Sequence, residues 1–223
     1  MSELAVDAER RQLLEAALPH VAFDGWSWVS LRAAGEEIGL DAGRVENAFP
    51  GGPSEALELY IAEADRRMLQ ALEQHDLSAM KVHDRVALAI RLRLEQHARD
   101  REAIRRGLAV LALPQHTGLC LRTLYRTVDA IWAAAGDTAT DYNFYTKRLL
   151  LAGVYMVTLL YWLEDTSEEH AATWAFLDHR LDRAMRLGRG IGGTMHALLD
   201  LPDRLIEWVP LRPGGRRPDA PFE

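Results

Sequence analysis

The sequence predicts an all-α protein built from about nine or ten helices. Apolar residues recur at the three- and four-residue spacing of helices from one end of the chain to the other, and the first such stripe is Leu13, Leu14, Ala17, Leu18 and Val21. No stretch alternates apolar and polar residues for long, and no short turn joins two β-branched runs, so we expect no strand. The third observation is an uncharged apolar run at 149–163, which is too short to cross a bilayer.

Capping residues and helix breakers set the expected boundaries. Ser30 and Asp41 are expected to cap two short helices, and Ser54 the long helix after the Pro-Gly-Gly-Pro sequence at 50–53. The helices are expected at about 7–21, 30–38, 42–49, 54–75, 80–98, 100–112, 116–135, 140–164, 168–187 and 194–209. We divide the chain into an N-terminal unit (1–53), a helical bundle (54–188) and a C-terminal segment (189–223) with a glycine hinge, an amphipathic helix and a disordered tail.

Composition and charge are those of an ordinary globular protein. The chain has 223 residues, of which 48% are hydrophobic and 26% charged, and its formal net charge is −7. An acidic balance disfavours general nucleic-acid binding, which usually needs a basic face. Cys120 is the only cysteine, which excludes an intrachain disulfide and a cysteine metal site. We recognise no secretory or transit segment, so we expect a cytoplasmic protein in a bacterium or a processed mitochondrial protein.

Residues 30–53 have the shape of a helix-turn-helix unit without the charge of a DNA-reading one. Two short helices surround a tight turn and a long helix follows, and this pattern resembles the DNA-binding end of TetR-type regulators. The charged residues of this range sum to −2: Arg32, Arg44, Glu36, Glu37, Asp41 and Glu46. Because phosphate contacts supply most non-specific DNA affinity, we interpret the unit as a vestigial helix-turn-helix that caps the bundle. A ligand-responsive transcription regulator is the alternative.

The most specific string is Gly136-Asp-Thr-Ala-Thr-Asp-Tyr-Asn-Phe-Tyr-Thr-Lys-Arg148, which leads into the apolar run. Together with Thr-Trp-Ala-Phe-Leu-Asp-His-Arg at 173–180, Leu-Ala-Leu-Pro at 111–114 and Gly25-Trp26, it resembles the accessory lipid-binding protein of ubiquinone biosynthesis, a family of mitochondria and alpha-proteobacteria. The resemblance covers roughly residues 10–190. It implies a TetR-like bundle that has lost DNA binding, a homodimer, a cavity for an isoprenoid quinone or other lipid, and partnership with the demethoxyubiquinone hydroxylase.

The start of the helix at 140–164 has the composition of a protein-binding surface. Thr140 is a suitable cap, and Asp141 is well placed at the positive end of the helix. Aromatic side chains beside an arginine are typical of binding hot spots. The resemblance places a hydroxylase-contacting patch at Asp129, Ile131, Phe144, Tyr145 and Arg148, with Phe144 in place of an expected tryptophan. From the residues alone, the two aromatics can equally be core side chains.

The apolar run at 149–163 is apolar on every side, so packing one face against a core does not account for it. Two interpretations stay open: protein covers the helix all round, or a lipid covers part of it. The candidate residues for a lipid cavity are Leu113, Leu150, Tyr155, Met156, Leu159, Trp162 and Leu163. Gly153 costs about 1 kcal/mol relative to alanine in a helix, and it permits close approach of a neighbour.

The segment at 194–209 predicts an amphipathic helix that touches a membrane surface. The family it resembles also ends in such a helix. The candidate membrane-contact residues are Leu198, Leu199, Leu205, Ile206 and Trp208. An acidic polar face and Pro202 argue against this, so a helix that folds back or pairs in the dimer is the alternative. We expect peripheral membrane association, on the matrix side in a mitochondrion.

No catalytic or metal-binding motif is found in the sequence, and the Gly-x-Gly-x-x-Gly pattern at 188–193 follows a predicted helix rather than a strand, so we do not interpret it as a dinucleotide site. The sequence lacks the Glu-x-x-His pairs of di-iron hydroxylases, the His-Glu-x-x-His zinc motif, a nucleophile elbow and a P-loop. We therefore predict a non-catalytic accessory protein, without cofactor or metal, which presents an isoprenoid quinone precursor to the hydroxylase. An isoprenoid tail does not leave a bilayer for water without a cavity of similar apolarity. A lipid-modifying enzyme is disfavoured.

Overall fold

The computed structural model describes the backbone of residues 3–136 and 143–199 and the side chains of 5–136 and 146–186. Within these ranges, nine α-helices and three single-turn 3-10 helices follow one another and no strand occurs, which confirms the all-α prediction. The α-helices are α1 (Glu3–Asp24), α2 (Trp28–Glu37), α3 (Ala42–Ala48), α4 (Pro53–Leu72), α5 (Val82–Glu95), α6 (Arg101–Leu111), α7 (Thr117–Ala134), α8 (Asn143–Glu164) and α9 (Ala171–Leu199). The 3-10 helices are Leu77–Ala79, Pro114–His116 and Glu168–His170.

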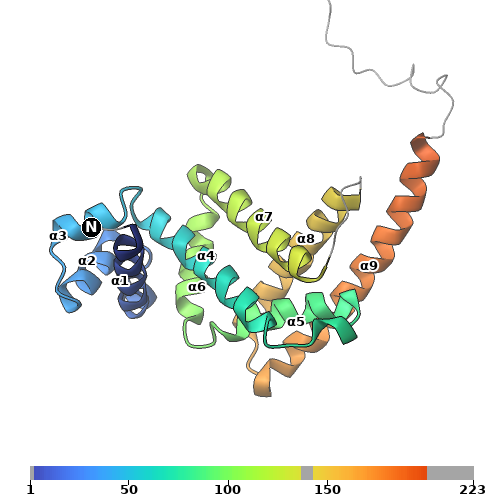
Figure 1. The fold of residues 1–223 in the computed structure, drawn as a ribbon, viewed down its shortest axis with the longest axis horizontal. Coiled ribbons are helices and arrows are strands. Elements are labelled where there is room, and N and C mark those ends of the chain that lie inside the picture. The colour runs from blue at the N-terminus through green and yellow to red at the C-terminus, as the bar shows by residue number, and fades with distance from the viewer. Residues whose placement is uncertain (1–2, 137–142, 200–223) are drawn as a thin grey trace, which may run out of the picture.

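Helices α1, α2 and α3 lie together at one end of the molecule, and α4 leads from them into a bundle with α5 to α9 (Figure 1). Buried side chains form two clusters, and α4 contributes to both. The first cluster contains the predicted stripe of α1, where Leu13, Leu14, Ala17 and Val21 are buried. The second joins the end of α4 to α5, α7, α8 and α9 around Trp162. Helix α4 therefore connects the two clusters, and α6 also packs against both of them.

The helix caps agree with the sequence at α3 and correct it at α2 and α4. Asp41 caps α3, and its Oδ1 accepts a hydrogen bond from the Arg44 amide at 2.9 Å. Ser27, not Ser30, caps α2, because Ser27 has the extended backbone of a cap while the Ser30 hydroxyl donates to the Gly25 carbonyl at 2.7 Å. Helix α4 begins at Pro53, one residue before the expected cap at Ser54. Proline suits the first helical position, where its missing N–H would be unpaired anyway.

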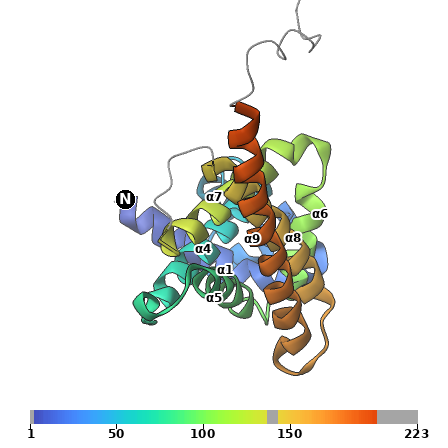
Figure 2. The same cartoon turned by 90° about the vertical axis from the view of Figure 1, so that its right-hand side faces the viewer.

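Helix α9 corrects the predicted break at the glycine cluster. It runs without interruption from Ala171 to Leu199, through residues 188–193, where we expect a hinge. Each glycine costs about 1 kcal/mol in a helix relative to alanine but leaves helical dihedrals accessible, so composition alone does not end the helix. In Figures 1 and 2 the last turns of α9 extend away from the other helices.

The predicted membrane segment lies mostly outside the described residues. Leu198 and Leu199 close α9, and only their backbone is described. Leu205, Ile206 and Trp208 lie outside the described residues, as does the predicted cap Thr140 of α8. No helix in the described part of the chain is long and apolar enough to cross a membrane.

Candidate functional site

A cavity of about 80 Å³ lies where α4, α5, α6, α7 and α8 meet. At Gly107 of α6 a Cβ atom would lie 2.9 Å from Leu57 Cδ1 of α4, so a larger residue at this position would require the Leu57 side chain to shift. The apolar lining residues are Leu57, Ile61, Ala64, Ile104, Gly107, Leu108, Leu111, Cys120, Leu124, Tyr155, Met156 and Leu159. The cavity has room for several water molecules. It therefore accepts a small group as it stands, and a larger ligand has to displace side chains of the wall.

One polar residue of the cavity wall, Arg93, belongs to a buried ion pair. Arg93 of α5 and Asp65 of α4 are both buried, and Arg93 Nε donates to Asp65 Oδ1 at 2.8 Å. Thr127 of α7 donates its hydroxyl to the same carboxylate at 2.9 Å. The Arg93 guanidinium also lies 5.5 Å from the ring centre of Tyr155 on α8. Because Asp65 balances Arg93, this polar wall adds no net charge to the cavity.

The second polar part of the wall is the pair Tyr60 and His97. The Tyr60 hydroxyl and His97 Nδ1 are 2.8 Å apart, and His97 is only 2% exposed. Burial, together with the positive charges of Arg93 and Arg67, lowers the pKa of His97 from 6.5 to about 3. Burial also raises the pKa of Tyr60 above its ordinary value. Both groups are therefore neutral at physiological pH.

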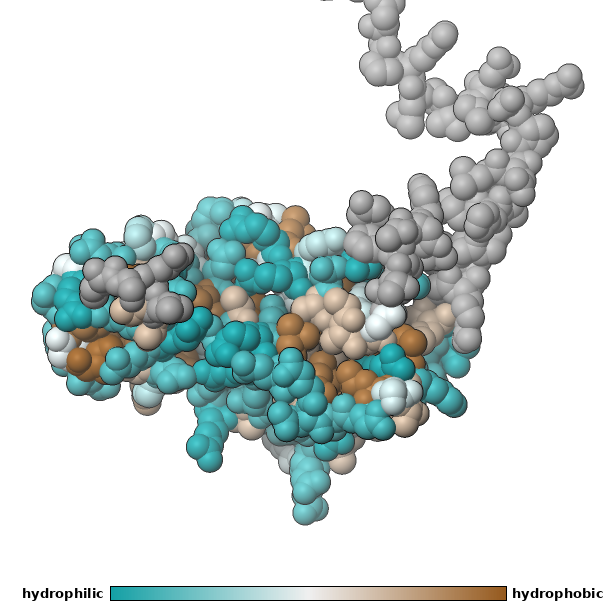
Figure 3. Space-filling view, in the orientation of Figure 1, coloured by the Kyte–Doolittle hydropathy of each residue, from teal (hydrophilic) through white to brown (hydrophobic). Residues whose placement is uncertain are grey.

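A second apolar feature is the outer face of α8. Leu149 is 76% exposed, Leu160 is 52% exposed, and Val157 and Tyr161 are also exposed. Leu121 and Tyr125 of α7 are exposed as well. In Figure 3 apolar residues gather on the half of the surface where α5, α7 and α8 lie, and a smaller apolar group is visible at the end formed by α1, α2 and α3. A Cβ atom at Gly153 would meet nothing within 4 Å, so no neighbour among the described residues makes the expected close approach there.

The structure brings three of the predicted lipid-binding residues together. Tyr155, Met156 and Leu159 line the cavity. Trp162 and Leu163, one turn further along α8, are buried in the core instead, where Trp162 lies 4.6 Å from the Arg101 guanidinium. The remaining two residues do not line the cavity, since Leu150 is half-buried and Leu113 is 43% exposed.

The residues predicted to contact a partner are placed differently from one another. Ile131 of α7 has no exposed surface and packs in the core, so its side chain is not at the surface of this structure. Arg148 is buried, and its Nη2 lies 2.7 Å from Oδ1 of Asp129, whose side chain is 44% exposed. Phe144 and Tyr145 are in the first turn of α8, and their side chains lie outside the described residues.

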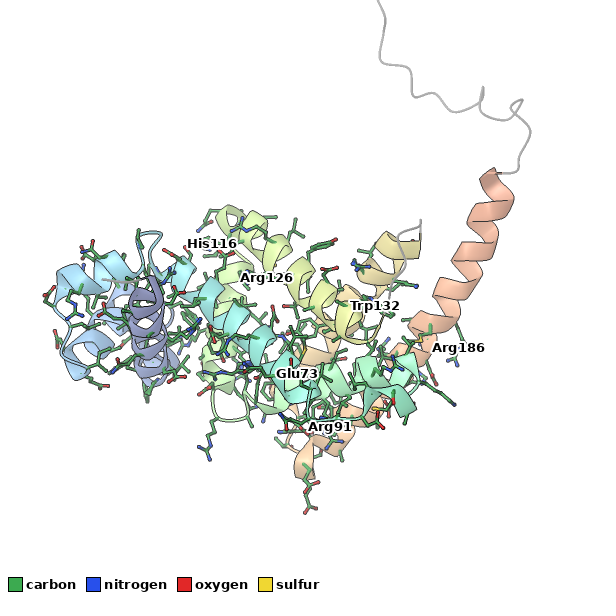
Figure 4. All side chains as sticks on the ribbon, viewed as in Figure 1. Glu73, Arg91, His116, Arg126, Trp132 and Arg186 are labelled. Atoms are coloured by element: carbon green, nitrogen blue, oxygen red, sulfur yellow. The ribbon has the colours of Figure 1, made fainter. Side chains whose placement is uncertain are left out.

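Helices α7 and α8 are joined at this end by a hydrogen bond as well as by the ion pair. Trp132 Nε1 donates to the Lys147 carbonyl at 3.3 Å, and Figure 4 shows Trp132 near the end of α7. The Asp129–Arg148 pair lies on the same two helices. Asp129 and Arg148 therefore position the start of α8 against α7, and Asp129 is the one of the two that also reaches the surface.

Sequence reasoning did not find the polar wall of the cavity. Arg93 lies in a helix rich in charged residues, where an arginine suggests an exposed position, and its burial depends on Asp65 from another helix. His97 follows the end of α5 and belongs to no recognisable motif. Within the described part of the chain, no group of three metal-binding side chains occurs.

The two basic residues of the helix-turn-helix unit are both engaged in ion pairs. Arg32 Nη2 lies 2.7 Å from Oε1 of Glu46, and Arg44 pairs with Glu9 of α1. Phosphate contact by either arginine would require it to leave a carboxylate of its own chain. The arrangement agrees with the acidic balance of this segment.

Comparisons with known proteins relate the chain to one family. The COQ9 family model matches residues 117–188. The "Ubiquinone biosynthesis protein COQ9, mitochondrial" of Drosophila melanogaster is 34% identical over 186 residues, which cover 82% of this chain and 57% of that protein. The protein of the same name from Rattus norvegicus is 31% identical over 186 residues, with 80% and 59% covered. The chain thus spans 57% and 59% of the length of these two relatives.

A solved structure shares the fold. The crystal structure of the TetR transcriptional regulator from Nitrosomonas europaea ATCC 19718 matches with a TM-score of 0.66 at 19% sequence identity, and the match covers 80% of this chain and 98% of that one. At this identity the likeness shows the fold alone, and it confirms the predicted TetR-like bundle. The family rests on the sequence comparisons instead: with the COQ9 family model matched and two relatives above 30% identity over most of its length, the chain belongs to the COQ9 family.

Proposed function

We propose that this chain is a non-catalytic, lipid-binding accessory protein of ubiquinone biosynthesis. In this proposal it binds an isoprenoid quinone precursor and presents it to the demethoxyubiquinone hydroxylase. The observation that carries the proposal is the cavity at Tyr155, Met156 and Leu159, whose wall is mainly apolar and whose buried charges cancel. The names of the relatives, which are ubiquinone biosynthesis proteins, support the pathway.

The apolar surface near the cavity supports the same proposal. An isoprenoid chain is too long for about 80 Å³, so most of it has to lie on other apolar surface. Met156 is half-buried and unbranched, and a flexible thioether side chain is well suited to move aside for a ligand. The exposed apolar side chains of α8 then offer either a path for the tail or a contact for a second copy of the chain in a homodimer.

Filling the cavity is expected to remove bound lipid. Ala64 is buried in the cavity wall, and the larger side chain of Ala64→Leu would occupy the space that a ligand needs. A ligand has to displace the added leucine side chain, and a cost of about 1.4 kcal/mol for that displacement lowers affinity tenfold. We therefore expect at least a tenfold loss of co-purified isoprenoid lipid, measured by organic extraction and mass spectrometry.

The matched control for this experiment is Ala8→Leu, the same substitution at an exposed position of α1. It should keep the lipid content of the unmodified protein. Equal lipid content in Ala64→Leu would place the ligand elsewhere, and no lipid in any preparation would count against lipid binding itself.

The start of α8 is proposed to contact the hydroxylase. Tyr145→Lys should weaken capture of purified demethoxyubiquinone hydroxylase by at least tenfold, because aromatic hot spots contribute about 2 kcal/mol or more when truncated. Gln74→Lys adds the same charge at an exposed position after α4 and should leave capture unchanged. Titration by biolayer interferometry measures both affinities. An equal affinity for the two variants would remove this surface from the proposal.

The remaining parts of the proposal concern the membrane and DNA. We assign the membrane contact to the end of the chain from Leu198 onward, and we propose that the protein lies peripherally at a membrane surface. A transcription regulator is less well supported, because Arg32 and Arg44 already pair with carboxylates of this chain. The residues at 1–53 then act as a folded cap on the bundle.

A further inference from the structure

We propose that the cavity recognises an oxygen-bearing ring through a hydrogen bond from His97 Nε2–H, and that it distinguishes this ring from a bare hydrocarbon. The ligand class is a neutral aromatic or quinone ring with carbonyl, phenolic or methoxy oxygens. This inference rests on the proposed lipid-binding function and names the part of the lipid that enters the cavity.

The first observation is an unpartnered nitrogen on a residue that lines the cavity. His97 is 2% exposed, and its Nε2 atom is buried without a hydrogen-bond partner in the described part of the chain, so a ligand acceptor reaches it only when a side chain of the wall moves. A buried polar group without a partner costs about 1–3 kcal/mol. A ligand that supplies the missing hydrogen-bond partner would remove this cost.

The second observation sets the direction of the missing hydrogen bond. A neutral imidazole carries one N–H, and burial keeps His97 neutral by lowering its pKa. The Tyr60 hydroxyl is 2.8 Å from Nδ1, and burial keeps it protonated by raising its pKa. A phenol O–H donates more strongly than its oxygen accepts, so Tyr60 donates to Nδ1 and the imidazole hydrogen resides on Nε2. The missing partner is therefore an acceptor, and Tyr60 is the positioning residue that selects this tautomer.

The third observation is the charge and size of the cavity. Arg93 is paired with Asp65 at 2.8 Å, so an anionic ligand would not find an uncompensated cation in the wall. About 80 Å³ suits one oxygen substituent and the adjoining ring edge, with further room gained when Met156 moves. A neutral ring oxygen satisfies all three observations, whereas a hydrocarbon tail leaves Nε2–H unpartnered.

The chain carries its own reporter for a test. Cys120 is the only cysteine in the sequence, it lines the cavity, and it is half-buried. A ligand in the cavity should therefore slow alkylation of this thiol by N-ethylmaleimide. Two probes of matched shape are compared: 1,2,3,4-tetramethoxy-5-methyl-6-prenylbenzene, which has only acceptor oxygens, and the analogue with ethyl groups in place of methoxy groups.

We expect the unmodified protein to be protected by the methoxy probe at a concentration at least tenfold lower than by the ethyl probe. His97→Phe should bind both probes alike, with the ethyl probe bound as in the unmodified protein. His97→Gln keeps an N–H donor in this region and should retain part of the preference for the methoxy probe. Tyr60→Phe should reduce the same preference, because the imidazole hydrogen is then no longer held on Nε2. Thermal unfolding of each variant reports whether it is folded.

The outcomes separate this inference from the proposed function. Equal protection by the two probes in the unmodified protein, or an unchanged preference in folded His97→Phe, would overturn the inference and leave the lipid site in place. Absence of protection by either probe, combined with absence of lipid in organic extracts, would overturn the lipid-binding proposal together with it.

Discussion

Replacing Asp65 with alanine is expected to lower the free energy of unfolding by about 3–5 kcal/mol, the usual cost of removing one partner from a buried ion pair. Arg93 would keep its charge in a buried position without the carboxylate that lies 2.8 Å away, and the Thr127 hydroxyl would lose its acceptor. Urea unfolding followed by tryptophan fluorescence measures the change. Because Asp65 lies on α4 and Arg93 on α5, the stability of the bundle should depend strongly on the contact between these two helices.

Two variants give this experiment its controls. Glu102→Ala removes a carboxylate that also pairs with arginines, Arg105 and Arg106, but on the surface, where solvent screens the charges, so it should change stability far less than Asp65→Ala. The double variant Asp65→Leu with Arg93→Met replaces both charges by apolar groups and should recover most of the lost stability. A loss below about 1 kcal/mol for Asp65→Ala would show that the guanidinium finds water or another partner.

Acid is expected to destabilise the protein through His97. Folded His97 stays neutral down to its pKa of about 3, whereas in the unfolded chain it takes up a proton below its ordinary pKa of 6.5. The unfolded state therefore binds more protons between these two values, and stability falls as the pH falls. The contribution of His97 to the free energy of unfolding is complete above pH 6.5, and it declines by up to about 1.4 kcal/mol for each pH unit below that value. Urea unfolding at pH 7, 6, 5 and 4 measures the decline.

The variant His97→Gln isolates this contribution from that of the carboxylates. Burial alone would raise the pKa of Asp165, but hydrogen bonds from Thr173 and Ser167 outweigh burial and hold that pKa below its ordinary value, so acid also acts there. Glutamine does not titrate, and His97→Gln should lose about 3 kcal/mol less than the unmodified protein between pH 7 and pH 4. His75→Gln, at an exposed position, should follow the unmodified protein. Parallel curves for all three would mean that His97 is solvated in the folded state.

Local features of the sequence predicted the helices and part of the cavity. The stripe of α1 and the cap at Asp41 follow from spacing and capping within a few residues, and the structure has both. Tyr155, Met156 and Leu159 were within reach of sequence reasoning because they belong to an unusually apolar helix. The glycine cluster at 188–193 shows the limit of such reasoning. A residue with low helix propensity lowers the stability of a helix but does not determine the residue at which the helix ends.

By itself, the sequence determined the all-α class, the order of the helices, the acidic helix-turn-helix unit and the resemblance to one family, because each of these depends on neighbouring residues. Only the tertiary structure decided which polar side chains are buried. Asp65 meets Arg93 across 28 positions of the chain, and Tyr60 meets His97 across 37, between helices whose packing no local pattern encodes. The same packing buries Ile131 and leaves a cavity beside Met156, since the space between helices is set by the fit of side chains from five of them.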